Sequence, residues 1–210
     1  MNQPLKSRSA EIPKLTEDQL GIMREFLVQT LDQAASSMGQ MLRIRIKADL
    51  LGFGEGEIDR IQEFDDLGQF RVHVMKVALK GPIGGAFYFI VNSHELDTIN
   101  RVCLPKEVSA PTNSESRQIK FGFIAEIENM IAALATTEIS EFLGVQLFGQ
   151  VPEISIIQGN AVNEYLWEEA HANHSTFFVR SVLAGMVVEV APHFIWMLDD
   201  EFKRILRMNS

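Results

Sequence analysis

One segment of the chain places an acid and an amide where both can meet an approaching protein. If residues 121–144 (FGFIAEIENMIAALATTEISEFLG) form a helix, Glu126 and Asn129 lie one turn apart and project outward together. Their neighbours on that side of the helix are all small: Ala133, Thr136 and Thr137. A partner could therefore come close to this helix, although polar residues at such spacing are most often simply hydrated.

The same segment carries an apolar stripe that needs a surface to pack against. Its members recur at steps of three and four residues: Ile124, Ile127, Ile131 and Leu134. Because this stripe points away from the acid and the amide, we expect it to face a sheet. We expect Thr112 or Ser114 to cap the helix, which should run to about Phe142, with Gly144 as the glycine that ends it.

The chain before this helix predicts a helix followed by strands. Thr16 and Gln19 form a capping-box pattern, which predicts a long helix from about Glu17 to about Gln40. Alternating or continuous apolar runs predict three strands, at 42–47, 70–77 and 86–91. A short helix should follow over 93–102, and the glycine- and acid-rich residues 52–66 should form a loop.

The chain after the linker at 104–113 repeats this order. Its long helix should be followed by strand within 145–157, by a hairpin within 177–190, and by an amphipathic C-terminal segment. Phe89-Ile90 is mirrored by Phe194-Ile195, and Glu25 by Glu126. We therefore predict an α+β fold, a pseudo-twofold internal repeat whose antiparallel sheet has two long helices packed on one face.

This repeat sets the expected domain organisation. Residues 1–14 are polar and proline-containing, which favours a flexible tail. Residues 15–210 should form one domain, with a first half over about 15–104 and a second half over 113–210.

Composition narrows the class of protein. The 210 residues carry a formal net charge of −9, so we expect no nucleic-acid or anionic-membrane partner. There is one cysteine and the first residues have no apolar core typical of a signal peptide, so we expect a cytoplasmic protein. No stretch is long and apolar enough to predict a membrane span.

For the other residues that could carry chemistry, we expect no catalytic or metal-binding role. His171 and His174 lie beside Glu168 and Glu169, but no further ligand is evident, so we expect a hydrated surface and no metal site. Cys103 has no histidine near it in sequence that could activate it, which favours a structural thiol.

The segment around Asn129 resembles the active helix of the CheC/CheX phosphatases of chemotaxis. The motif of that family is Glu, two residues, Asn, twenty-two residues, Pro, and Glu126, Asn129 and Pro152 match it. The sequence around Asn129 and the following segment VPEISIIQGN are more similar to CheX than to CheC. The resemblance in plan covers about residues 15–208, with the motif in the second half.

The resemblance implies a protein-aspartyl-phosphate phosphatase that acts on a phosphorylated, CheY-like response regulator. Asn129 would position the attacking water and Glu126 would dock the receiver domain, while Ala133, Thr136 and Thr137 would contact it and Pro152 would be structural. Mg²⁺ would belong to the partner receiver, and this chain would need no cofactor of its own. CheX-like relatives also imply a homodimer.

Two departures from the family pattern keep other functions open. Gly122 stands where the family often has Asp or Ser, and Ala133 where it often has Gly. In the first half, Glu25 is kept but Val28 and Leu51 replace the Asn and Pro, so we expect one active site per chain. The main alternative is a catalytically weak or inactive binding module for response regulators, resembling flagellar switch middle domains. A weaker alternative is a sensor that binds a small ligand between its repeats.

Overall fold

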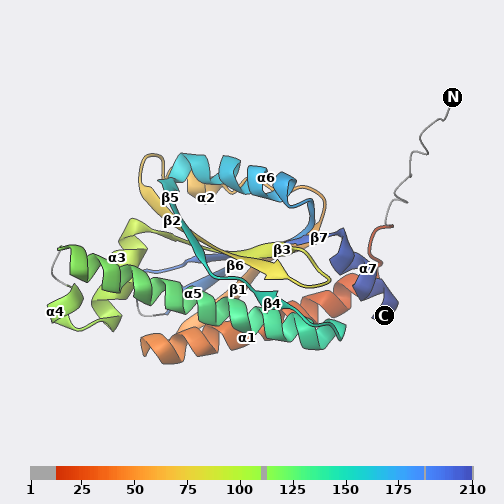
Figure 1. The fold of residues 1–210 in the computed structure, drawn as a ribbon, viewed down its shortest axis with the longest axis horizontal. Coiled ribbons are helices and arrows are strands. Elements are labelled where there is room, and N and C mark those ends of the chain that lie inside the picture. The colour runs from red at the N-terminus through yellow and green to blue at the C-terminus, as the bar shows by residue number, and fades with distance from the viewer. Residues whose placement is uncertain (1–12, 110–112, 187, 210) are drawn as a thin grey trace.

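The computed structural model describes residues 13–109, 113–186 and 188–209, which form three layers (Figure 1). The first half contains α1 (Glu17–Leu42), β1 (Ile46–Glu55), α2 (Gln62–Asp66), β2 (Arg71–Lys80), β3 (Gly85–Asn92), α3 (Ser93–Cys103) and α4 (Lys106–Ser109). The second half contains α5 (Ser114–Leu143), β4 (Phe148–Gly149), β5 (Glu153–Gln158), η1 (Gly159–Ala161), α6 (Val162–Ala172), β6 (Ser175–Gly185), β7 (His193–Asp199) and α7 (Asp200–Asn209). The long helices α1 and α5 lie on one face of the sheet, while α2 and α6 lie on the other. The predicted α+β class is confirmed.

The sheet has seven strands, and every pairing within it is antiparallel. The strand order is β1-β6-β7-β3-β2-β4, and β5 also pairs with β2. Strands β3 and β7, one from each half, therefore meet in the middle, as a pseudo-twofold arrangement requires. Each of them leads directly into a helix, α3 or α7.

The two central strands show how the halves correspond. Asn92 caps α3, and Asp199 accepts hydrogen bonds from the first backbone amides of α7, so these two residues are equivalent. Aligning the two caps shifts the match expected between Phe89 and Phe194 by two residues. With the caps aligned, Tyr88 and Ile195 are equivalent, and they pair directly across the strands.

Two apolar cores lie on opposite faces of the sheet. Under α1 and α5, the central strands contribute large aromatic residues: Phe87, Phe89, Phe194 and Trp196. On the other face, Tyr88 and Ile195 pack with Leu166 of α6. Because β3 is buried on both faces, its sequence is continuously apolar instead of alternating.

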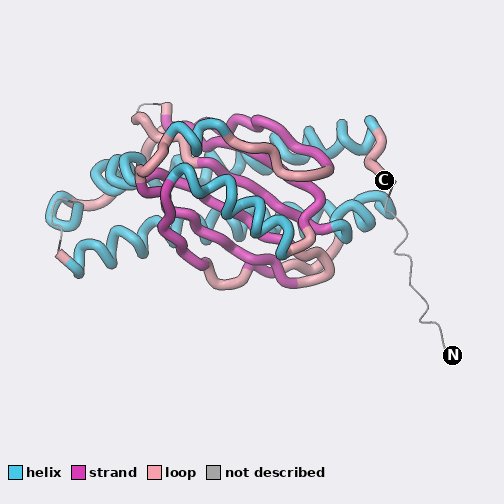
Figure 2. Tube along the Cα trace, turned by 90° about the horizontal axis from the view of Figure 1, so that it is seen from above, coloured by secondary structure: helices cyan, strands magenta, loops and turns pink. Residues whose placement is uncertain are grey.

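The second face is covered by elements that the sequence did not predict. Figure 2, seen from above, shows one helix lying across the middle of the strands; this is α6. The expected loop at 52–66 is wrong in part, because β1 continues to Glu55 and α2 follows. The second strand of the predicted hairpin at 177–190 is also wrong, because β6 pairs instead with β7.

Strand β1 begins later and ends later than predicted. Arg43 adopts a left-handed conformation that ends α1, so the expected strand at 42–47 starts only at Ile46. The strand then runs through Gly52 and Gly54, with a register shift between Leu50 and Gly52 against β6. An edge strand with a bulge tolerates such glycines.

None of the described helices is long and apolar enough to cross a membrane.

Candidate functional site on helix α5

Helix α5 is built by clear local signals. The side chain of Asn113 accepts a hydrogen bond from the backbone N–H of Ser116 at 2.8 Å, so Asn113 is the N-cap. The alternative cap Ser114 is therefore wrong, and Thr112 lies outside the described residues. At the other end Gly144 has φ of 65°, a left-handed conformation that glycine adopts readily, which confirms its predicted place.

The polar stripe of α5 faces outward as the spacing predicted. Glu126, Asn129, Ala133 and Thr137 are all exposed, while three members of the apolar stripe are buried: Ile124, Ile127 and Ile131. Within the described chain, no hydrogen bond or ion pair engages the side chain of Glu126 or of Asn129. Both groups are therefore free to meet a partner.

Thr136 does not belong to this outward surface. Only 5% of it is exposed, and its hydroxyl donates a hydrogen bond to the backbone oxygen of Ala132 at 2.7 Å. It lies against β4, where a Cβ added to Gly149 would come within 3.9 Å of its hydroxyl oxygen. The expectation that Thr136 contacts a partner is wrong, because it lies on the sheet-facing side of the helix.

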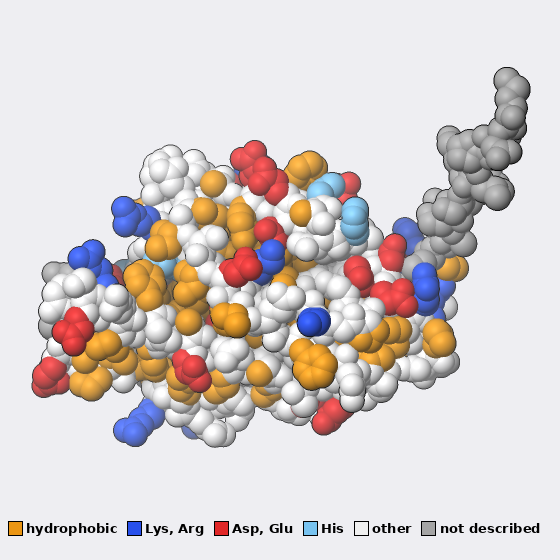
Figure 3. Space-filling view, viewed as in Figure 1, with side chains coloured by type: hydrophobic (Ala, Val, Ile, Leu, Met, Phe, Trp, Pro, Cys, Tyr) orange, Lys and Arg blue, Asp and Glu red, His pale blue; other side chains and the backbone are white. Residues whose placement is uncertain are grey.

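Pro152 interrupts the edge of the sheet next to α5. It lies between β4 and β5, which both pair with β2. Proline has no N–H to donate, so it suits the outermost strand, where the position needs no ladder hydrogen bond. The edge beside α5 also exposes large apolar side chains: Phe148, Val151, Ile154 and Ile156. Figure 3 shows hydrophobic side chains scattered over this side of the molecule.

A second carboxyl group of α5 is buried, which the sequence reading missed. Glu128 is fully buried, and neither of its carboxyl oxygens has a hydrogen-bond partner among the described residues. Burial raises the pKa of Glu128 to about 9. The acid is therefore neutral at pH 7. Glu128 lies four residues after Ile124 and three before Ile131, and this helical spacing indicates that it shares their buried side.

The departures from the motif have simple structural settings. Gly122 is exposed, and a Cβ added there would meet no atom within 4 Å. The stripe therefore lacks a side chain at that point without any steric reason. On α1, the equivalent positions Glu25 and Val28 are also exposed, but they offer an acid without an amide.

Two other observations concern metal binding and the single cysteine. In the part of the chain that the structure describes, no group of three or more His, Cys, Asp or Glu residues could hold a metal ion. Burial raises the pKa of the Cys103 thiol to about 11, so the thiolate is scarce at pH 7.

Comparisons with known proteins place the fold. No protein-family model and no curated protein match this chain. Among solved structures, FliY from Thermotoga maritima aligns with 92% of this chain and 96% of its own, with a TM-score of 0.68 at 15% identity. CheX in the CheX–CheY–BeF3–Mg²⁺ complex from Borrelia burgdorferi aligns with 82% of this chain and 97% of its own, with a TM-score of 0.54 at 13% identity. The chain therefore shares its fold with these FliY and CheX structures.

This fold does not by itself separate CheX from its structural relatives. The FliM middle domain from H. pylori aligns with 92% of this chain and 99% of its own, with a TM-score of 0.54 at 10% identity. At such identities the likeness concerns the fold.

Proposed function

We propose that this protein binds the receiver domain of a phosphorylated response regulator through α5 and hydrolyses its aspartyl phosphate. The observation that carries the proposal is the exposed pair Glu126 and Asn129, which lie one turn apart and have no hydrogen-bond or ion-pair partner among the described residues. Small exposed residues continue the stripe, and an apolar edge borders it, which suits contact with another protein. The fold shared with the CheX of a CheX–CheY complex agrees with such a partner.

Asn129 would hold the attacking water. Hydrolysis of an acyl phosphate needs a water in line with the leaving carboxylate, and an amide can both donate to and accept from that water. Asn129 needs no altered pKa for this role. A carboxylate at the same place would repel the phosphoryl group, so an amide is the better choice.

Glu126 would fix the position of the receiver. A carboxylate one turn from the amide can pair with a lysine of the receiver, which sets the register of docking. The receiver would also contribute Mg²⁺ to neutralise the phosphoryl oxygens. This chain would then supply the water-positioning amide alone, with no cofactor of its own. Self-association into a homodimer is a separate proposal, which light scattering would test.

Phosphate release from a phosphorylated receiver domain tests the proposal. Wild-type protein should accelerate release, and Asn129→Ala should lower that acceleration at least about tenfold, since misplacing a reacting group by about 1 Å costs up to about 100-fold. Val28→Ala on α1 is the matched control and should leave the rate unchanged. Equal rates for wild type and Asn129→Ala would contradict the role of Asn129.

A binding module without catalysis is the second candidate. Gly122 favours it, because the stripe lacks a side chain on the turn before Glu126. This candidate predicts that the receiver binds, that Glu126→Ala weakens binding, and that wild type does not accelerate phosphate release. Absence of receiver binding would contradict both candidates.

A further inference from the structure

The face opposite α5 exposes a tryptophan on α6. Trp167 is 49% exposed, whereas Trp196, the other tryptophan of the chain, is fully buried. The ring of Trp167 packs against the ring of His171 at 3.8 Å between centroids. The Nδ1 atom of His171 lies 2.8 Å from the backbone oxygen of Trp167, so one helical turn holds both rings in place.

A hollow lies on each side of Trp167. One has a volume of about 390 Å³ and reaches toward Asn160 and Glu164. The other has a volume of about 310 Å³ and reaches toward His174. Residues 58–60, which precede α2, line the first hollow and residues 56–58 line the second. Both hollows share Ile58 and Trp167, so together they form a groove along α6 with Trp167 in its middle. We call this the α6 groove.

The α6 groove is acidic. Glu57 and Asp59 on one wall and Glu164 on the other are exposed, and none of the ion pairs between described residues involves them. Arg60 also lines the groove, but its guanidinium is paired with Asp65. Its Nε and Nη2 atoms donate hydrogen bonds to the Asp65 carboxylate at 2.6 and 2.8 Å. Figure 3 shows acidic side chains and histidines gathered over α6.

We propose that the α6 groove binds a basic segment of a partner protein, with a lysine or arginine placed against Trp167. The exposed face of an indole ring attracts a cation, and the flanking carboxylates strengthen that attraction while they repel anionic ligands. The groove lies across the sheet from α5, so this partner and a receiver domain could be bound at the same time. The inference does not depend on the function proposed for α5.

Fluorescence of the full-length protein tests this inference. The probe is the capped tetrapeptide Arg-Lys-Arg-Lys, and because Trp196 is buried, a change in emission reports on Trp167. We expect a saturable change that weakens as salt is added. Glu164→Lys should raise the Kd about tenfold, which corresponds to about 1.4 kcal/mol.

Glu141→Lys is the matched control, because it makes the same charge change at an exposed position on α5. It should change the Kd less than about twofold, because salt screens the interaction between the peptide and a charge on the other side of the sheet. Asp59→Asn, on the opposite wall of the groove, should also weaken binding, and circular dichroism would confirm that each variant is folded. No saturable change in the wild type, or equal weakening by Glu164→Lys and Glu141→Lys, would overturn the inference. Phosphate release by Glu164→Lys should match the wild type, so the outcome is independent of α5.

Discussion

Glu128 of α5 and Leu27 of α1 occupy equivalent, fully buried positions on the two long helices. When the two helices are aligned at their C-terminal ends, Arg43 and Gly144, Leu27 matches Glu128. The same alignment matches Glu25 with Glu126. The side chains of Leu27 and Glu128 are both 0% exposed. The helix that bears the candidate site thus has a carboxylic acid at a position where the other helix has leucine.

This relationship predicts that Glu128→Leu stabilises the protein. A buried polar group without a partner costs about 1–3 kcal/mol, and leucine already fits the equivalent place on α1. Urea unfolding at pH 7 should show a gain of that size. As a control, Leu27→Glu should destabilise the protein, because it would add a second buried acid. A loss of stability in Glu128→Leu would show that the acid makes a favourable contact.

The same acid predicts a pH dependence of stability. The pKa of Glu128 is about 9 in the folded protein, well above its ordinary value of 4.5. Between these values the unfolded chain loses the proton while the folded chain keeps it, so the free energy of unfolding falls as pH rises. The slope contributed by this group is at most about 1.4 kcal/mol per pH unit.

Glu128→Gln should remove that slope, because its amide does not titrate. We expect the stability difference between Glu128→Gln and wild type to grow steadily from pH 5 to pH 8 in urea unfolding. A difference that stays constant over this range would mean that Glu128 ionises in the folded protein as it does in the unfolded chain.

Replacing Gly122 by alanine should stabilise the protein. Glycine in an exposed helix interior costs about 1 kcal/mol relative to alanine, and a Cβ at this position meets no atom within 4 Å. Gly122→Ala should therefore raise the free energy of unfolding by about 1 kcal/mol. Gly39→Ala is the contrasting variant, because there an added Cβ would lie 2.8 Å from the backbone oxygen of Ile44. It should destabilise the protein.

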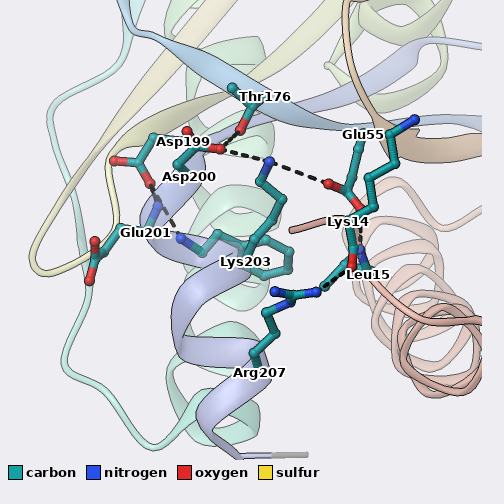
Figure 4. Close-up of polar contacts among 10 residues, drawn as sticks. Lys14, Leu15, Glu55, Thr176, Asp199, Asp200, Glu201, Lys203 and Arg207 are labelled. Atoms are coloured by element: carbon teal, nitrogen blue, oxygen red, sulfur yellow. Dashed lines mark hydrogen bonds and ion pairs between the residues drawn. The ribbon is translucent and has the colours of Figure 1, made fainter. Parts of the chain in front are cut away.

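Removing the side chain of Lys203 on α7 should cause a large loss of stability. Lys203 is 6% exposed and pairs with Glu55 of β1 at 3.3 Å and with Asp200 at 2.7 Å (Figure 4). Glu55 also accepts a hydrogen bond from the backbone N–H of Leu15, so this cluster joins the start of α1 to β1 and α7.

Lys203→Ala should cost about 3 kcal/mol or more, because it leaves a partly buried carboxylate without its cation. Its neighbour Arg204 forms an exposed pair with Glu201, so Arg204→Ala should cost less than about 1 kcal/mol. Thermal unfolding of the two variants would distinguish them. Equal effects would mean that the Lys203 cluster does not hold α7 in place.

The faces of α5 could be predicted from sequence because its two stripes repeat at helical spacing over several turns. Ile124 and Ile127 are buried and Glu126 and Asn129 exposed, as that spacing requires. Thr136 was misplaced because a small residue at the border between the stripes fits either side. The pattern of spacing cannot decide which side such a residue takes.

The layer formed by α6 was not predicted, although Val162, Leu166 and Ala170 recur at steps of four residues and are all buried. The signals at its ends are weak, because no side chain caps its start and the polar residues His171 and Asn173 lie where it ends. Its formation depends on burying Leu166 and Ala170 against the sheet, which is a tertiary contact. In the same way, Gly52 and Gly54 of β1 suggested a loop, but pairing with β6 makes them part of a strand.

Phosphate release from a phosphorylated receiver domain, compared between wild type and Asn129→Asp, tests the central claim most directly. This substitution keeps the size of the side chain but replaces an amide with a carboxylate at the position proposed to hold the water. We predict that Asn129→Asp abolishes the acceleration of phosphate release while Val28→Asp on α1 preserves it. An Asn129→Asp variant as fast as the wild type would contradict the account.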